Sequence, residues 1–163
     1  MINHEELLKK ITAEVVNDEN VNKIKLAITD IDGVLRGKYV HKEKFKSILE
    51  GGFGFCDVVF GWDSSDVSYD NSKATGWHTG YPDASVSIDL GTYRRVPWDE
   101  NVPFFLGHFE DDQKNRLEIC PRNLLRTVRE KALNQGYTPL FSQEFEWFNF
   151  KETSQELHDR GFR

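Results

Sequence analysis

The protein has 163 residues, of which 38% are hydrophobic and 13% aromatic, enough for one globular domain or a small domain with part of another. Its net charge is −6 and its lysines and arginines are dispersed, which argues against a nucleic-acid-binding surface. No apolar run approaches membrane-spanning length and no signal segment begins the chain, so we expect a cytoplasmic protein with no membrane partner.

The cysteines and histidines give no sign of a metal site. Cys56 and Cys120 lack the close spacing of zinc ligands, which favours structural roles in a reducing compartment. His41, His78 and His108 have no ligand partner at suitable spacing. We therefore expect ordinary surface or core roles for these three histidines.

The first half of the chain predicts a helix, two strands and a second helix. Apolar residues recur at helical spacing over residues 3–16, with Asn3 as the N-cap. Alternating patterns predict strands over 23–30 and 35–40, joined by a turn. A helix over 43–49, ended by two glycines, precedes an apolar run that reaches Trp62.

The second half opens with a polar, turn-rich loop over residues 63–78, and a loop of this length is usually functional or disordered. Strands are predicted over 84–90 and 102–110. Pro121 begins a helix that Gly136 ends. Its apolar face would be formed by Leu124, Leu125, Val128, Ala132 and Leu133.

A strand is predicted over residues 138–150, and it carries two carboxylates. Side chains alternate along a strand, so Glu144 and Glu146 would share one face, with Phe145 and Trp147 on the other. Two acids on one face suit a hard cation such as Mg²⁺ or Mn²⁺. The alternative is an edge strand with one solvated face.

A different reaction class is suggested near the first strand. Residues 25–35 resemble the first motif of haloacid-dehalogenase-type phosphatases, in which Asp30 would be the nucleophile and Asp32 the general acid beside a magnesium ion. The same residues also suit an ordinary hairpin turn. The segment after Gly33 returns as a strand rather than crossing over as a helix, which fits a phosphatase poorly.

Six motifs in order resemble the glutamine synthetase family and its relatives that ligate glutamate to other amines. The resemblance spans about residues 23–150. The motifs are Asp32-Gly-Val-Leu-Arg-Gly-Lys38, Phe60-Gly-Trp-Asp-Ser-Ser65, Tyr81-Pro-Asp-Ala-Ser85 with Ile88-Asp89, Tyr93-Arg-Arg-Val-Pro-Trp98, Cys120-Pro-Arg-Asn-Leu-Leu125 and Gln143-Glu-Phe-Glu-Trp-Phe-Asn-Phe150.

The resemblance implies an α+β fold with three parts. An N-terminal helix (1–20) would precede a β-grasp-like domain with a mixed sheet (21–119). Residues 120–163 would form the first helix and strand of an incomplete α/β catalytic domain. The implied reaction phosphorylates the γ-carboxylate of glutamate with ATP, and ammonia or another amine then displaces phosphate.

The resemblance also assigns roles to three acidic residues. Glu144 and Glu146 match the Glu-x-Glu carboxylates that hold the divalent cations. Asp63 matches the acid of a Phe-Asp-Gly-Ser-Ser loop, which reaches a neighbouring subunit's site and helps to bind and deprotonate ammonium. Ser64 replaces the family's glycine, so a turn-capping role for Asp63 stays open.

The sequence leaves the roles of four basic residues open. Arg36 and Lys38 would meet a phosphate or an acidic neighbour, or lie on a solvated hairpin face. Arg94 and Arg95 are unassigned.

The family's nucleotide-binding residues and remaining metal ligands lie beyond its first Glu-x-Glu strand. We therefore expect this chain to be the N-terminal part of the enzyme, inactive alone, with the complete protein forming a homo-oligomeric ring. A non-catalytic interaction module is the alternative, which exposed apolar surface would favour.

Overall fold

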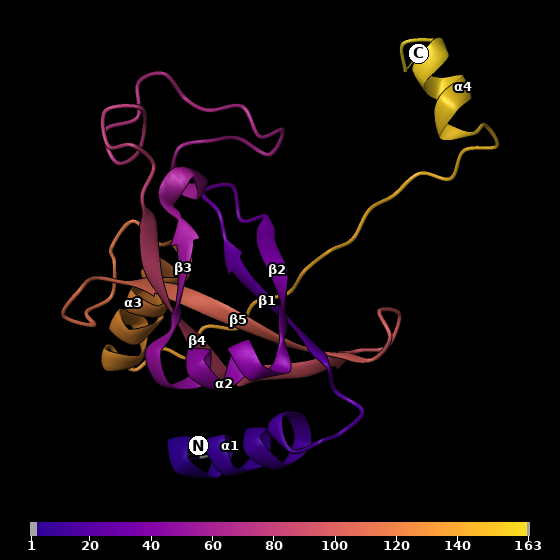
Figure 1. Ribbon diagram of the computed structural model, residues 1–163. Coiled ribbons are helices and arrows are strands. Elements are labelled where there is room, and N and C mark those ends of the chain that lie inside the picture. The colour runs from indigo at the N-terminus through magenta and orange to yellow at the C-terminus, as the bar shows by residue number, and fades with distance from the viewer. Residues whose placement is uncertain (1–2, 163) are drawn as a thin grey trace.

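The computed structural model describes residues 3–162 and contains one five-stranded sheet with helices around it (Figure 1). The elements in chain order are α1 (His4–Ile11), a π-helical turn η1 (Thr12–Val16), β1 (Lys23–Thr29), β2 (Leu35–His41), α2 (Lys42–Gly51), β3 (Phe53–Cys56), a 3₁₀ turn η2 (Asp57–Phe60), β4 (Asp83–Val96), β5 (Val102–Glu110), α3 (Pro121–Asn134) and α4 (Ser154–Asp159).

The sheet is mixed, with the strand order β2-β1-β5-β4-β3. The central strands β1 and β5 are parallel, and the other neighbours are antiparallel. Strand β4 is one long strand through Val96, with an irregularity between Asp89 and Arg94. The strand predicted over 84–90 is thus confirmed and extended. The architecture agrees with the predicted α+β, β-grasp-like fold.

The amphipathic patterns explain how the helices cover one face of this sheet. Ile11 from α1 and Phe45 from α2 pack with Leu26 of β1 and Phe105 of β5 in one buried cluster. The Asn3 side chain accepts a hydrogen bond from the Glu5 backbone N–H, as predicted for the N-cap. Figure 1 shows α1 and α2 together at one end of the sheet.

A second buried cluster lies on the same face, next to the long polar loop. Ile28 of β1 and Phe109 of β5 pack with Val59 and Phe60 from η2. The rings of Phe60 and Phe109 meet edge to face at 4.7 Å. This packing places the residues that follow η2 beside the turn between β1 and β2.

Helix α3 corrects one expectation about packing. Its predicted apolar side chains are largely exposed, Leu124 at 59% for example, and its buried residue is the polar Asn123. Asn123 Nδ2 donates to the carbonyl oxygens of Phe109 (2.7 Å) and Leu117 (3.0 Å). The side-chain amide of Asn123 therefore anchors α3 to the residues beside it. No apolar surface in the described residues covers the leucines of this helix.

The strand predicted over residues 138–150 is wrong for this chain. The segment has no strand pairing, and Figure 1 shows it as a long trace that leaves the sheet and ends at α4. Alternation alone does not make a strand, because the backbone N–H and C=O groups also need a neighbouring strand. No helix within residues 3–162 is both long and apolar enough to cross a membrane.

Candidate functional site

The turn between β1 and β2 is built around the carboxylate of Asp30, whose side chain is 0% exposed. Its oxygens accept hydrogen bonds from the backbone N–H groups of Asp32 (3.0 Å) and Val34 (2.8 Å). A third bond comes from Arg36 Nε at 2.7 Å. A buried carboxylate held by three donors organises a turn, and it is poorly placed to attack a phosphate ester. This geometry favours the hairpin interpretation over the phosphatase alternative.

Arg36 joins this turn to the polar loop. Its Nη1 group forms an ion pair with Asp66, and its Nη2 group donates to the carbonyl oxygen of Asp63 at 3.4 Å. The guanidinium also lies over the Trp62 ring, 4.8 Å from its centroid. The hydrogen bond to Asp30 is the largest cause of a raised pKa for Arg36, and the interaction with Asp66 raises it further. Of the alternatives left open for Arg36, the structure thus shows the acidic neighbours Asp30 and Asp66.

Asp63 itself closes the start of the loop. Its Oδ1 accepts hydrogen bonds from the backbone N–H groups of Ser65 (2.8 Å) and Val67 (3.0 Å), which is the turn-capping role left open by the sequence. Its Oδ2 accepts no hydrogen bond from the residues that the structure describes. One oxygen therefore holds the loop, while the other is available to a cation or a proton.

Tyr69 lies in the electrostatic field of the same acids, and the sequence pattern gave no reason to select it. The backbone N–H of Tyr69 donates to the Gly61 carbonyl at 2.7 Å, which brings it back to the start of the loop. Partial burial raises the pKa of its hydroxyl, and the charges of Asp32 and Asp63 raise it further. The turn and the loop thus form one acidic region, which favours a cationic ligand over an anionic one.

Glu144 and Glu146 are not brought to this region by any described contact. Both are exposed in the segment between α3 and α4, and neither forms a hydrogen bond or ion pair with another residue in the range 3–162. No group of three or more potential metal ligands occurs among the described residues. A metal-binding role for Glu144 and Glu146 therefore stays a prediction.

Lys38 and Arg94 have structural partners. Lys38 Nζ donates to the Gly54 carbonyl at 3.0 Å and lies over the ring of Phe53, which ties β2 to β3. Arg94 lies over the ring of Phe104, 5.4 Å from its centroid. Neither residue meets a carboxylate within the described part of the chain.

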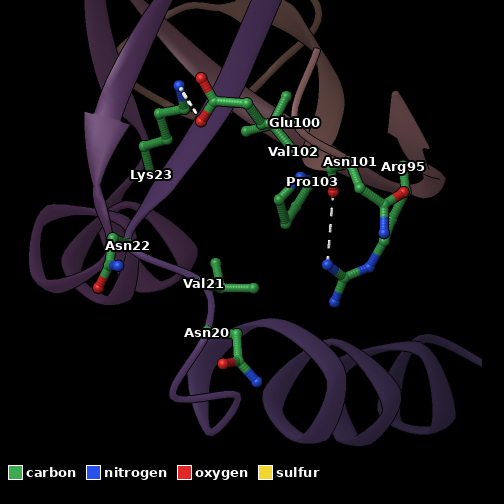
Figure 2. Close-up of a pocket in the computed structure, with 9 residues that line it drawn as sticks. All are labelled: Asn20, Val21, Asn22, Lys23, Arg95, Glu100, Asn101, Val102 and Pro103. Atoms are coloured by element: carbon green, nitrogen blue, oxygen red, sulfur yellow. Dashed lines mark hydrogen bonds and ion pairs between the residues drawn. The ribbon is translucent and has the colours of Figure 1, made fainter. Parts of the chain in front are cut away.

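Arg95 lines a cavity of about 180 Å³ where the chain after η1 meets the β4–β5 hairpin (Figure 2). Its guanidinium donates to the carbonyl oxygens of Glu14 (2.8 Å) and Asn101 (3.4 Å) and to the carboxylate of Asp18. Figure 2 shows Lys23 and Glu100 paired on the other side of the cavity, 2.9 Å apart. Arg95 is thus occupied in fastening the N-terminal segment to the sheet.

Comparisons with known proteins find relatives named as glutamine synthetases and glutamate–amine ligases. It is 46% identical over 151 residues to a type-1 glutamine synthetase of Dictyostelium discoideum, covering 91% of this chain and 29% of that protein. The chain is related to the glutamine synthetase family. The chain is also 38% identical over 148 residues to a glutamate–isopropylamine ligase of a Pseudomonas species, covering 90% of this chain and 32% of that protein.

Solved structures agree on the fold of this glutamine synthetase relative. A glutamine synthase homologue superposes with a TM-score of 0.60 at 20% identity over 72% of this chain and 28% of that one. Glutamine synthetase of Plasmodium falciparum gives 0.57 at 19% identity over 83% of this chain and 23% of that one. No family model matches the sequence. The chain thus spans about three tenths of the curated relatives named above.

Proposed function

We propose that this glutamine synthetase relative is the N-terminal part of an ATP-dependent ligase that joins ammonia or another amine to the γ-carboxylate of glutamate through a γ-glutamyl phosphate. The main support for this proposal is the geometry of Asp63. One carboxylate oxygen fixes the loop through two backbone N–H groups, and the other has no partner among the described residues.

A carboxylate so placed suits the amine half of the reaction. It attracts an ammonium group electrostatically and then accepts its proton, which frees the lone pair for attack on the acyl phosphate. The surrounding acids strengthen this attraction, while Arg36 holds the loop in position through Asp66 and the Asp63 carbonyl. Asp63 is therefore our proposed catalytic residue.

Glu144 and Glu146 are proposed to bind Mg²⁺ or Mn²⁺ together with donors that the described residues do not provide. The cation would neutralise charge on the phosphoryl group transferred from ATP. Since residues 3–162 contain no set of three potential ligands, we expect the 163-residue chain by itself to be inactive. We also propose that the complete enzyme is cytoplasmic and forms a ring of identical subunits whose sites lie between neighbours.

An enzyme assay with several amines tests the proposed reaction and identifies the amine that is used. The 163-residue chain, and any longer product of the same gene, would be incubated with ATP, Mg²⁺ and glutamate. Ammonia, isopropylamine and ethanolamine would be offered separately, and phosphate release and γ-glutamyl amide would both be measured. We expect product only from a longer chain, and amide synthesis by the 163-residue chain would refute the proposed inactivity.

An Asp63→Asn variant of whichever chain is active tests the proposed role of the Asp63 carboxylate. Asparagine keeps an oxygen for the two loop N–H groups but neither attracts a cation strongly nor accepts a proton, so we expect the rate with amine to fall by about 10² or more. Asp70→Asn, in the same loop, is the matched control. Equal activity of the two variants would remove Asp63 from the mechanism.

Exposed aromatic residues favour a second candidate, an interaction module. The segment between α3 and α4 leaves large apolar side chains open to solvent, including Trp147 at 73% exposure and Phe148 at 85%. Several large apolar side chains exposed along one short segment suit burial against a partner. Light scattering after gel filtration would test it, alone and mixed with a full-length glutamine synthetase; a monomer that binds no synthetase would contradict this role.

A further inference from the structure

A second polar cavity lies between α3 and the sheet, away from the Asp63 loop. It has a volume of about 250 Å³. The polar residues that line it are Asp89 of β4, His108 of β5, and Arg122, Asn123, Arg126 and Arg129 of α3. The three arginines are spaced at i, i+4 and i+7, so they share one face of the helix.

The positive charge at this cavity is only partly neutralised. Arg122 is paired with Asp89 at 2.6 Å. The nearby Glu130 is paired with Arg116 at 2.7 Å. Arg126 and Arg129 form no ion pair or hydrogen bond with any residue in the described range. The charge of Glu130, which Arg116 already pairs, interacts with Arg126 and Arg129 at longer range. Two guanidinium groups without an ion pair of their own, in a protein of net charge −6, favour an anionic ligand.

The wall of the cavity also contains a buried hydrogen-bond acceptor without a donor. Asn123 is 2% exposed, and its Nδ2 group is committed to two backbone carbonyls, Phe109 and Leu117. These two bonds fix the orientation of the amide, so the opposite atom is the oxygen. Asn123 Oδ1 has no partner in the described residues, and a buried unsatisfied acceptor of this kind is costly.

His108 provides a second unpaired acceptor. Its Nε2 lies 3.3 Å from Glu110 Oε1, which places the ring proton on Nε2. Burial is the main cause of a lowered pKa for His108, and Arg126 and Arg122 lower it further, whereas Glu110 and Asp89 raise it. The neutral ring thus leaves Nδ1 as an acceptor, and this atom also has no partner among the described residues.

We infer that this cavity binds a small oxyanion that also carries a proton, with monohydrogen phosphate as the best match. Its oxygens would accept hydrogen bonds from Arg126 and Arg129, and its hydroxyl would donate to Asn123 Oδ1 or His108 Nδ1. Reaching these buried atoms requires a small movement of the side chains around them. Binding of phosphate in this cavity would not depend on the amide synthesis proposed above.

Calorimetric titration of the full chain with phosphate at pH 7.5 and constant ionic strength tests the inference. Sulfate is the discriminating probe, because it has a similar size and charge but no hydroxyl donor at this pH. We expect saturable binding of one phosphate per chain and several-fold weaker binding of sulfate. No saturation, or equal affinity for the two anions, would overturn the assignment.

Variants on one helix locate the site. Arg126→Gln and Arg129→Gln should each weaken phosphate binding about tenfold or more, as expected for the loss of a charge-assisted hydrogen bond. Lys131→Gln removes the same charge from the same helix outside the cavity and should leave the affinity unchanged. An equal loss in all three variants would mean nonspecific attraction and would contradict the site. Nitrogen NMR of the His108 ring gives a local readout, since Nδ1 should shift on addition of phosphate.

Discussion

Substitution of Arg36 by glutamine tests the link between the β1–β2 turn and the Asp63 loop. Arg36 Nε donates to the fully buried Asp30 carboxylate at 2.7 Å, and glutamine cannot replace this charge. Asp30 would keep its two backbone donors, so the loss should correspond to one charge-assisted hydrogen bond. We expect the free energy of unfolding to fall by about 2 to 3 kcal/mol.

Urea denaturation followed by fluorescence measures this change. With a slope of about 2 kcal/mol per molar urea, the midpoint should fall by roughly 1 to 1.5 M while the slope stays constant. Lys46→Gln is the control, because Lys46 forms an exposed ion pair with Glu43 at 2.8 Å and should contribute about 0.5 kcal/mol or less. Equal shifts for the two variants would refute the special role of Arg36.

A double-mutant cycle measures the interaction between Arg36 and the buried Asp30 separately from the other contacts of Arg36. Replacing Asp30 by asparagine in the Arg36→Gln background should cost less than the same change in the wild-type protein, because the two residues interact directly. Hydrogen exchange should also become faster in the 63–68 loop of Arg36→Gln. Unchanged exchange would show that Arg36 does not position this loop.

Three further predictions follow from packing and burial. Gly37→Ala should cost about 1 to 3 kcal/mol in urea denaturation, because a Cβ there would lie 2.5 Å from the Leu26 carbonyl oxygen; Gly51→Ala, which meets no atom within 4 Å, should be near neutral. Phe105→Ala, at a fully buried site, should cost about 3 to 5 kcal/mol by the same measurement, and a loss below 1 kcal/mol would contradict the observed core. Burial lowers the pKa of His108, so the unfolded chain, with an ordinary histidine pKa of about 6.5, takes up the proton first as the pH falls. Stability should therefore decline below about pH 6.5, and His108→Gln should reduce that slope in denaturation curves measured at a series of pH values.

Local sequence patterns were sufficient for most of the elements. The predicted strand over 102–110 coincides with β5, and Asn3 caps α1 as expected. Pro121 and the positive φ of Gly136 bracket α3. These features depend on side-chain alternation, capping and backbone freedom, which neighbouring residues determine among themselves.

The sequence selected Asp63 and left two roles open for it, and the structure shows the loop-capping contacts, while its catalytic role stays a prediction. The role of Arg36 was also open, and only the structure pairs it with Asp30 and Asp66. The motif pattern gave no indication of Tyr69. The roles of Glu144 and Glu146 stay predictions, since no described contact engages them.

The sequence by itself determined most of the helices, the strands β1, β2 and β5, and the family relationship, because these follow from periodicity, capping and ordered motifs. Only the tertiary structure decided whether an alternating segment is a strand: residues 138–150 have the pattern but no partner backbone. It also decided that α3 docks through Asn123 with its leucines exposed, and that Arg126 and Arg129 lie at a cavity with Asn123 and His108. Strand pairing, burial and convergence of charges depend on residues distant in sequence, and local patterns carry no information about them.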